Sequence, residues 1–447
     1  MVEILEFDQR LHGFISDEPN EKRSYSWSRY NIETEADSGC RLVYNTLYRT
    51  LCACSQELND SSDRMVLARY GFLVPQDANE YENYMGIRQI MRELSSTGSV
   101  GRFNILTTTG CNARCFYCFE NGLQTLTMAD HVADKVAEYI AKTASAHVHL
   151  RWFGGEPLVN HKAIDRICKN LEMAGVVFES SMSTNGTLFS VAMMGDAVKK
   201  WNLKQVRMSL DGLRDEHNRR KAIAGGVDAF QLVIDNAIRL SDAGVRVLLR
   251  ITMDPQNSEE CFKVADYLRV HFCGRQNVSA YTAMIFSETT PEAAAFDLRR
   301  VQRLVKDKER LDAKLISYGL FAYEKLTPVG FQTNFCAAND PSAVVIYPDG
   351  RLSCCETIDS DSEFWGDVSG CANQRKRLEW TGILDEPARE CRDCQYLPCC
   401  TSFFKKKCPH RYYDCKARCD YYHKLYMKCK YEKRSSALDV GTSKGVI

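Results

Sequence analysis

The feature that most constrains the fold is a regular alternation of two sequence patterns between about residues 102 and 284. Short apolar runs of β type alternate with longer segments whose apolar residues recur every three to four positions, as in amphipathic helices. This alternation is typical of βα units around a parallel sheet. Six strands fit a partial (β/α)6 TIM-like barrel, an α/β fold, better than a complete eightfold barrel. The strands are expected at 102–109, 147–155, 176–186, 205–212, 245–253 and 277–284.

The segments between these strands predict the helices of the barrel. Two of the segments end at Gly175 and Gly244, and glycine suits the left-handed position that follows many helices. The helices are expected at 128–143, 160–175, 228–244 and 258–272.

The rest of the chain divides around this core. Residues 1–98 mix a possible strand ribbon with short helices, which predicts an α+β N-terminal module that ends near the serine- and glycine-rich "SSTGSVG". The barrel is expected over 99–290. A charged helical bridge is expected over 291–330, with its charges on a solvated face. Residues 331–447 form a cysteine-rich C-terminal part.

Composition limits the classes of function. Lysine plus arginine number 58 and aspartate plus glutamate also 58, so no excess of positive charge favours binding to nucleic acid. No apolar run reaches the length of about 18 residues that a membrane span requires. The chain holds 21 cysteines, twelve of them between Cys336 and Cys429. A long chain that opens with the charged "MVEILEFDQR" does not resemble a secreted disulfide scaffold, so we expect a cytoplasmic protein whose cysteines bind metal.

Four polar or glycine-bearing segments follow successive predicted strands. In barrels of this kind, the loops after the carboxyl ends of the strands carry the chemistry. A single glycine segment after a strand ordinarily only shapes a turn, whereas four at the same end predict a site. The segments are "TTTGCNARCFYCFE" at 107–120, "GGEP" at 154–157, "STNG" at 183–186 and "SLDG" at 209–212.

The first segment carries Cys111, Cys115 and Cys118 in a C-x3-C-x2-C spacing. Three thiolates can hold a cubane iron–sulfur cluster and leave its fourth iron free of protein ligands. The alternatives are a zinc knuckle, which requires a fourth ligand, and three unrelated loop cysteines.

With Tyr117 before the last cysteine, this spacing resembles the signature of radical S-adenosylmethionine (radical SAM) enzymes. The resemblance implies that the three cysteines hold a [4Fe-4S] cluster whose open iron binds SAM, and that reductive cleavage of SAM yields a 5′-deoxyadenosyl radical.

Further motifs in the same order extend the resemblance and imply the remaining SAM contacts. "GGEP" resembles the segment that contacts the SAM amino group, and "STNG" the strand end that contacts its ribose or carboxylate. "SLDG" is followed in related maturases by an arginine that can pair with the SAM carboxylate, a position that Arg220 or Lys221 takes here. The alternative role of Ser209 and Asp211 is structural: these residues would form a turn and cap a helix. The implied contacts are Tyr117, Gly154, Gly155, Glu156, Ser183, Asn185, Ser209, Asp211, Arg220 and Lys221.

The C-terminal cysteines are similar in spacing to the SPASM extension of radical SAM enzymes, which binds auxiliary clusters. The phrase "VVIYPDGRLSCCE" also fits its hairpin, with Asp349 and Gly350 as the turn. Phe404 stands where the family pattern has a further cysteine. The resemblance implies two auxiliary [4Fe-4S] clusters, the first held by Cys336, Cys355 and Cys408 and the second by Cys391, Cys394, Cys400 and Cys419, with Cys354, Cys399 and Cys415 as alternative ligands.

The N-terminal module resembles the region of RiPP (ribosomally synthesised peptide) maturases that binds the leader of a precursor peptide, often by adding a strand to a sheet edge. A lid or structural extension is the alternative. The combined resemblance implies an oxidoreductase-type enzyme that installs a thioether or carbon–carbon crosslink in a precursor peptide made of leader and core. An external one-electron reductant such as flavodoxin or ferredoxin is expected, with no nucleic-acid or membrane partner.

Three other functions stay open at this point. An anaerobic sulfatase maturase would form formylglycine, and a peptide epimerase would need a thiol hydrogen donor. The alternative of another class is a non-catalytic zinc-binding adaptor.

Overall fold

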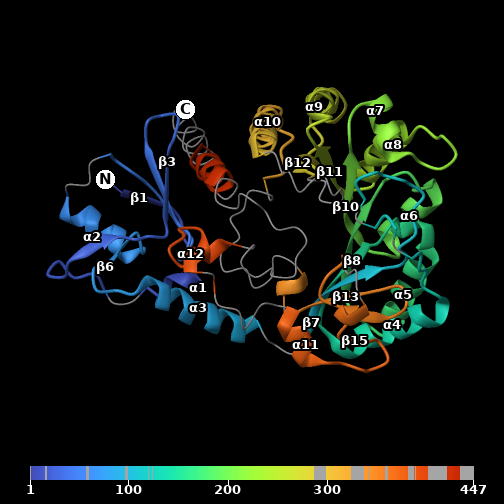
Figure 1. Ribbon diagram of the computed structural model, residues 1–447, viewed down its shortest axis with the longest axis horizontal. Coiled ribbons are helices and arrows are strands. Elements are labelled where there is room, and N and C mark those ends of the chain that lie inside the picture. The colour runs from blue at the N-terminus through green and yellow to red at the C-terminus, as the bar shows by residue number, and fades with distance from the viewer. Residues whose placement is uncertain are drawn as a thin grey trace, which may run out of the picture. The chain divides into compact units, whose positions relative to one another are not determined.

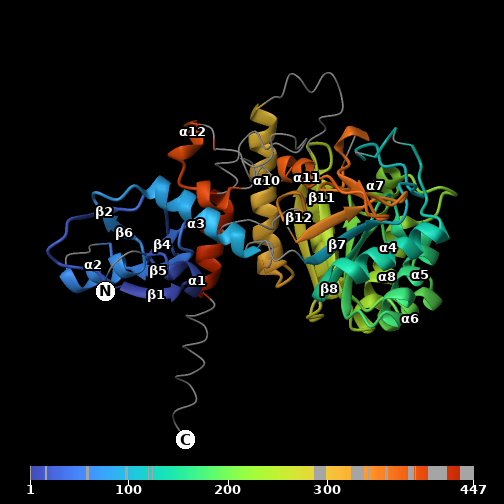
Figure 2. The same cartoon turned by 90° about the horizontal axis from the view of Figure 1, so that it is seen from below.

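A computed structural model describes residues 2–15, 18–56, 60–95, 99–118, 120–122, 124–285, 298–323, 337–340, 342–357, 361–380, 387, 389–400 and 420–432. The chain divides into two compact units (Figures 1 and 2). The first combines residues 1–97 with 326–335 and 382–447, and the second combines 98–325 with 336–381. The part expected as one C-terminal module, 331–447, therefore contributes to both units.

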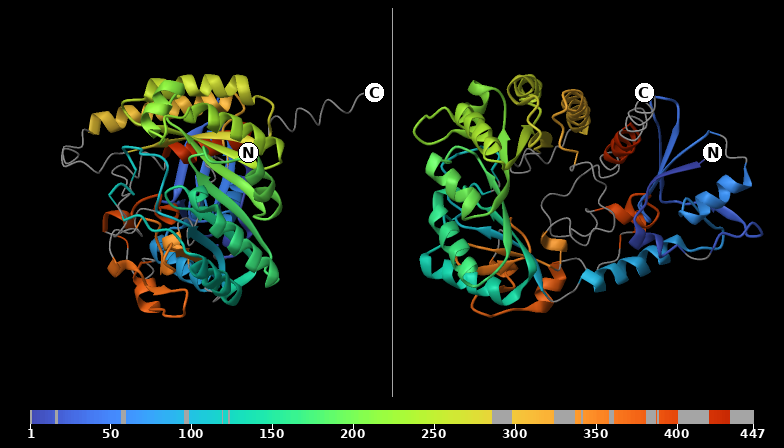
Figure 3. Two further views of the ribbon diagram at one scale, coloured as in Figure 1. Left: turned by 90° about the vertical axis from the view of Figure 1, so that its right-hand side faces the viewer. Right: turned by 180° about the vertical axis from the view of Figure 1, so that it is seen from behind.

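The second unit is built on a curved sheet in which β7 to β12 follow one another as parallel neighbours (Figure 3). No closed barrel is formed by these strands. The six predicted strands and the partial-barrel fold are confirmed. The strands are β7 (Val100–Leu106), β8 (Ala144–Phe153), β9 (Phe178–Thr184), β10 (Leu203–Leu210), β11 (Arg246–Met253) and β12 (Val278–Met284).

Helices cover one face of this sheet because alternate strand residues are apolar there. On β10, Val206, Met208 and Leu210 are fully buried, whereas the residues between them are polar and only partly buried. All four predicted helices are confirmed, and a further helix lies within the segment expected as a bridge. They are α4 (Asp130–Thr143), α5 (His161–Met173), α8 (Ala229–Asp242), α9 (Ser258–Phe272) and, from the bridge, α10 (Leu298–Ser317).

Two helices of this unit lack a clear apolar repeat in the sequence, α6 (Val191–Lys199) and α7 (Arg214–Lys221). The sequence of α7, RDEHNRRK, contains no aliphatic residue, yet His217, Arg220 and Lys221 are buried. Polar contacts with neighbouring elements therefore stabilise this helix in place of an apolar face. The glycines predicted to follow α5 and α8 in the left-handed conformation, Gly175 and Gly244, have φ of +72° and +81°.

The hairpin predicted at "VVIYPDGRLSCCE" is confirmed and extends the sheet. Its first strand runs parallel to β7, and its second is antiparallel to the first. Gly350 has φ of +87° in the turn, and its N–H donates to the Tyr347 carbonyl at 2.9 Å. The elements are β13 (Ala343–Ile346), β14 (Arg351–Ser353), β15 (Gly366–Asp367) and α11 (Gln374–Trp380).

The first unit contains a four-stranded antiparallel sheet in the order β1-β5-β4-β3. Val43 and Cys52 pack against helix α2 on one face of the sheet. The elements are β1 (Val2–Glu6), α1 (Gln9–His12), β2 (Tyr25–Trp27), β3 (Asn31–Glu35), β4 (Arg41–Asn45), β5 (Thr50–Cys54), α2 (Ser61–Arg69), β6 (Leu73–Pro75) and α3 (Glu80–Ser95).

C-terminal residues complete this first unit. Tyr44 of β4 makes ring contacts with His423 and Tyr426 of a helical segment at 420–432, red in Figure 1. Thr46 donates to the carbonyl of Gln395 at 2.6 Å, in the stretch that contains α12 (Arg389–Arg392). The N-terminal module and part of the cysteine-rich tail thus fold as one body.

Candidate functional site

The loop after β7 carries the three clustered cysteines, and all three thiols are half-buried. The Cys111 sulfur accepts the N–H of Ala113 at 3.3 Å, and Cys118 accepts a backbone N–H from Glu120. Such bonds stabilise a thiolate, the form that binds metal. Burial raises the pKa of Cys111 to about 11, so the positive charge of bound iron would keep it ionised. No three His, Cys, Asp or Glu side chains among the described residues lie close enough to hold one metal ion. In a cubane cluster, by contrast, the three thiolates would bind three different iron atoms and need not meet at one ion.

The glycine pair after β8 presses directly against this loop. The N–H groups of Gly155 and Glu156 donate to the carbonyls of Thr108 and Gly110, at 3.0 and 2.9 Å. A Cβ atom on Gly155 would lie 2.4 Å from the Gly110 oxygen, and one on Gly154 would lie 2.1 Å from that of Thr108. Only glycine permits this approach, which fixes the start of the cysteine loop.

Glu156 is fully buried and joins β8 to β9. Its carboxylate accepts the backbone N–H of Asn185 at 2.7 Å, that of Leu158 at 3.1 Å, and the Thr184 hydroxyl at 2.8 Å. Burial raises the pKa of Glu156 to about 7, against the effect of these donors. Both oxygens are occupied by the protein, so the side chain holds the two strand ends in place.

Asn185, at the end of β9, connects this network to the first cysteine. Its amide donates to the Asn112 side chain at 2.7 Å and lies 3.8 Å from the Cys111 sulfur. Asn112 in turn donates to the Thr187 hydroxyl at 3.0 Å. The second and third sequence motifs therefore meet at Cys111.

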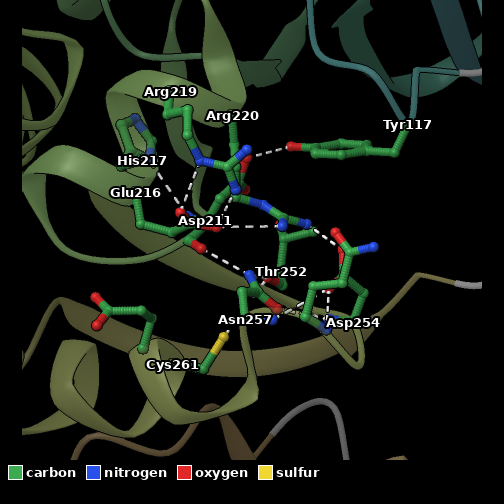
Figure 4. Close-up of polar contacts among 12 residues, drawn as sticks. Tyr117, Asp211, Glu216, His217, Arg219, Arg220, Thr252, Asp254, Asn257 and Cys261 are labelled. Carbon is green, nitrogen blue, oxygen red and sulfur yellow. Dashed lines mark hydrogen bonds and ion pairs between the residues drawn. The ribbon is translucent and has the colours of Figure 1, made fainter. Parts of the chain in front are cut away.

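The fourth motif meets the same loop at Tyr117 (Figure 4). The Tyr117 hydroxyl donates to Asp211 at 2.5 Å and accepts from the Lys221 ammonium at 2.7 Å. Lys221 also donates to the Ser209 hydroxyl at 2.8 Å and lies 3.3 Å from the Asp211 carboxylate. Burial alone would raise the pKa of Asp211, but the charge of Lys221 and the hydrogen bond from Tyr117 hold it below its usual value. Asp211 is therefore ionised.

The two candidate cations of α7 point to different partners. Arg220 forms ion pairs with Asp254 and Glu216, and its guanidinium lies over the Phe116 ring, 4.8 Å from the centroid. Lys221 instead points to Tyr117, Ser209 and Asp211. The carbonyl of Lys221 also accepts the N–H of Arg114 at 2.9 Å, so the end of α7 holds the cysteine loop by main chain as well. Of the two, only Lys221 contacts the other expected SAM contacts through polar bonds.

Ser183 is the expected contact that these networks do not include. It lies on β9 in register with Arg207 of β10, on the sheet face opposite the helices. Its side chain forms no hydrogen bond with any residue of the described ranges.

Among the tail cysteines, the second thiol of each doubled pair is the less buried one. Cys354 and Cys399 are buried, whereas Cys355 and Cys400 are half-buried. The Cys355 sulfur accepts the N–H of Thr357 at 3.4 Å. Cys111 accepts an equivalent bond, also from the residue two positions later in the chain. Half-buried Cys391 and Cys394 form a turn in the first unit. Cys336, Cys408, Cys415 and Cys419, as well as Phe404, lie outside the described residues.

The structure adds side chains that sequence reasoning missed. Asn112 lies inside the cysteine motif at a position that the motif does not specify. Glu356 follows the doubled cysteine and accepts from Arg151 at 2.8 Å and Asn104 at 2.6 Å. Glu120 lies near it, and burial followed by the charge of Glu356 raises the pKa of Glu120 to about 7. Only the pairing of β13 with β7 brings these carboxylates together, so no local pattern predicts them.

Comparison with known proteins supports this geometry. Residues 105–268 match the radical SAM superfamily model. A GTP 3′,8-cyclase of Alkaliphilus metalliredigens is 32% identical over 154 residues, which cover 33% of this chain and 47% of that protein. The chain thus spans about half the length of that relative. The radical SAM cyclopropyl synthase TigE of Paramaledivibacter caminithermalis is 22% identical over 428 residues, 87% of this chain and 86% of TigE.

Two solved structures share the fold. The structure of anSMEcpe with bound AdoMet and the Kp18Cys peptide has a TM-score of 0.58 and 16% identity, and covers 73% of this chain and 97% of that one. Streptococcus suis SuiB bound to the precursor peptide SuiA has a TM-score of 0.50 and 14% identity, and covers 88% and 100%.

Residues 105–268 are therefore a radical SAM domain, and the protein is an enzyme rather than a non-catalytic zinc adaptor. A radical SAM domain implies a [4Fe-4S] cluster with SAM. The residues present fit both groups: three half-buried thiols with N–H donors on one loop, and a buried ammonium and hydroxyl beside it, which suit a carboxylate. In the described residues, no helix is long and apolar enough to cross a membrane.

Proposed function

We propose that the enzyme is a maturase that removes two hydrogen atoms from a ribosomally made precursor peptide and closes a thioether or carbon–carbon crosslink. The observation that supports this proposal most directly is the convergence of three other strand-end segments on the cysteine loop, at Cys111 and Tyr117. When bound, the cluster and SAM supply a 5′-deoxyadenosyl radical that abstracts a hydrogen atom.

The protein's own residues would hold these groups and fix their orientation. Cys111, Cys115 and Cys118 would bind the cluster. Lys221 and Ser209 would bind the SAM carboxylate, because a buried ammonium pairs well with an anion. Asn185 and the main chain of Gly154 and Gly155 would line the opposite side, with Glu156 as the residue that positions them.

The auxiliary clusters belong to this proposal as well. Of the doubled cysteines, Cys355 and Cys400 are favoured by their exposure, and Cys355 also by its N–H···S bond. We retain Cys336, Cys355 and Cys408 as the first ligand set and Cys391, Cys394, Cys400 and Cys419 as the second. An auxiliary cluster would accept the electron that leaves the peptide when the crosslink forms.

A peptide substrate is supported by what the related structures bind. SuiB is bound to its precursor peptide, and anSMEcpe to a peptide with AdoMet. The name of TigE, a cyclopropyl synthase, favours carbon–carbon bond formation over a thioether.

The leader of the precursor would bind at the edge of β3. The Thr46 N–H donates to the Tyr30 carbonyl, and the Ala36 N–H donates to the Cys40 carbonyl, at the two ends of the β3–β4 ladder. These bonds establish which residues of β3 direct their N–H groups toward β4, because hydrogen-bonded and non-hydrogen-bonded pairs alternate along an antiparallel ladder. The N–H groups of Glu33 and Glu35 therefore point away from β4, free to pair with an added strand. The other edge, β1, is less suitable because its register shifts between Ile4 and Glu6.

The decisive experiment is anaerobic reconstitution with the short peptides encoded beside the gene. With a strong reductant or reduced flavodoxin, we expect 5′-deoxyadenosine and a peptide lighter by two hydrogens. A count of free thiols then separates a thioether, which consumes one, from a carbon–carbon bond, which consumes none. Cys115→Ala should abolish both products. Formylglycine formation on a cysteine-containing sulfatase peptide would instead support the sulfatase-maturase alternative, and a mass-neutral change that incorporates solvent deuterium would support an epimerase.

A further inference from the structure

The sheet face without helices in the second unit carries a series of basic side chains. Arg207 of β10 lies in register with Ser183, and Arg250 of β11 lies in register with Ser209 and Tyr281. Their neighbours along each strand, such as Val206 and Leu249, point to the helix-covered face and are fully buried. Alternation along the strands therefore directs both arginines into the concave side of the partial barrel.

Most cations of this face have an acidic partner. Arg102 pairs with Asp340 at 3.0 Å, Arg151 with Glu356 at 2.8 Å, and His149 with Glu179 at 3.3 Å. Arg207 and Arg250 differ: within the described part of the chain, neither side chain forms an ion pair or a hydrogen bond. The Nε atom of each is buried without a partner.

Two half-buried guanidiniums without ion-pair partners, each with a buried Nε atom, are unfavourable side by side. Arginine stays protonated in proteins, and a buried charge without a partner loses its hydration without compensation. Burial, followed by the charges of Arg151 and Arg250, lowers the pKa of Arg207, although Tyr281 and the Glu356 carboxylate act in the opposite direction. Because Arg207 and Arg250 are diagonal neighbours on adjacent strands, their side chains are within reach of a single anion.

The position of the pair relates it to the radical site. Arg250 lies in register with Ser209, whose hydroxyl accepts from Lys221, and its charge acts on the Tyr117 phenol. Arg207 lies two residues before Ser209 on the same strand and face. The pair therefore lies on the concave face of the sheet, next to Ser209 and the other residues that converge on the cysteine loop.

We propose that Arg207 and Arg250 form a carboxylate-binding site that takes an acidic side chain of the peptide substrate. The buried Nε–H of each guanidinium is a donor without an acceptor, and a carboxylate bound side-on would supply one. A bound carboxylate would neutralise the pair and hold the peptide beside the radical site. The inference rests on the proposed function, because only a peptide substrate brings such a side chain. The carboxylate of SAM has the same chemistry and is the alternative ligand of the arginine pair, although the proposed function places that carboxylate at Lys221 and Ser209.

The test uses two probes that differ only in charge, acetyl-Gly-Glu-Gly-amide and acetyl-Gly-Gln-Gly-amide. Their affinities are measured on the anaerobically reconstituted full chain with SAM bound. The wild type should bind the glutamate probe about tenfold or more tightly than the glutamine probe, as a charge-assisted pair predicts. The double variant Arg207→Gln, Arg250→Gln should lose this preference, and the double lysine variant should keep part of it. Arg246→Gln, on the same strand and at the protein surface, is the matched control and should keep all of it.

Other outcomes overturn the proposal. If the double glutamine variant weakens SAM binding while the wild type does not distinguish the probes, the pair binds the SAM carboxylate. GTP binding that depends on both arginines would assign the pair to a nucleotide phosphate. Equal binding of the two probes by the wild type, with SAM affinity unchanged in the variant, would make the pair structural. SAM cleavage is measured separately: a glutamate preference without cleavage would refute the radical function and keep the arginine site.

Discussion

Lys221 and Arg220 are adjacent buried cations on one helix, yet they contact different partners. Lys221 joins Tyr117, Ser209 and Asp211, whereas Arg220 is neutralised by Asp254 and Glu216. The motif alone could not decide between them, because a helix turns about 100° per residue and adjacent side chains point in different directions. The contacts of each side chain favour Lys221 as the proposed contact of the SAM carboxylate.

The change Lys221→Gln tests this assignment. It should lower SAM affinity about ten- to a hundredfold, because it removes a charge-assisted bond to the carboxylate. Equilibrium dialysis on reconstituted enzyme measures the dissociation constant, with iron content as a check that the cluster is retained. Arg219→Gln is the control, since Arg219 is exposed and its ion pair within the described ranges is with Glu216. Unchanged affinity in Lys221→Gln would assign the SAM carboxylate to another residue.

Glu156 and Glu120 predict a pH dependence of stability. Burial raises the pKa of each to about 7 from 4.5, so the native state binds more protons than the unfolded chain between these values. The free energy of unfolding should therefore fall as the pH rises from about 4.5 to 7, and stay low above it.

Denaturant unfolding between about pH 5 and pH 8, with metal loaded in all samples, measures this slope. Glu156→Gln should reduce the slope, leaving the contribution of Glu120. It should also lower stability at the acidic end by about 1–3 kcal/mol, because the amide leaves one backbone donor without an acceptor. A slope that is unaffected by the substitution would contradict the assignment.

At the scale of elements, the close approach of the β8 end to the cysteine loop depends on one missing side chain. Gly155→Ala would place a methyl group 2.4 Å from the Gly110 oxygen and displace the loop that presents Cys111. We expect iron loss and at least about a tenfold drop in 5′-deoxyadenosine formation, since a small displacement of a reacting group is costly.

Gly195→Ala is the control for this change. Gly195 lies inside α6, and a Cβ there would meet no atom within 4 Å. Alanine should stabilise that helix by about 0.5–1 kcal/mol without affecting iron content. Iron retention by Gly155→Ala at the wild-type level would show that the loop tolerates displacement.

The free edge of β3 gives a prediction for leader binding. Glu33→Pro removes an outward N–H while leaving the β3–β4 ladder intact, so leader affinity should fall about tenfold. Fluorescence anisotropy with a labelled leader peptide measures it. Glu33→Ala is the control: it removes only the partly exposed pair with Arg41, which contributes little. Equal leader affinity in both variants would place the leader elsewhere.

At the scale of the whole molecule, local patterns predicted the six strands and the order of the motifs, because each strand and each strand-end loop is continuous in sequence. They missed α7, which has no apolar repeat, and Arg207 and Arg250, whose meaning depends on the lack of an ion-pair partner on the neighbouring described strands. They also missed the union of residues 1–97 with the C-terminal segment. Thr46 and Gln395 are far apart in sequence, so only the folded chain shows their contact.

This union predicts that iron binding at the tail stabilises the N-terminal module. Cys391 and Cys394 pack against the core formed by Leu47, Tyr84 and Leu397 in the first unit. If these thiols hold an auxiliary cluster, metal binding contributes to folding of that core. Cys394→Ala should then increase deuterium exchange in α3 and β5, with no change in β8 to β11 of the second unit. Cys273→Ala, at an exposed thiol of the second unit, should leave both unchanged. If deuterium exchange in α3 and β5 is the same in iron-loaded wild type and in Cys394→Ala, these cysteines carry no cluster that is coupled to the module. Their half-burial would then reflect packing alone.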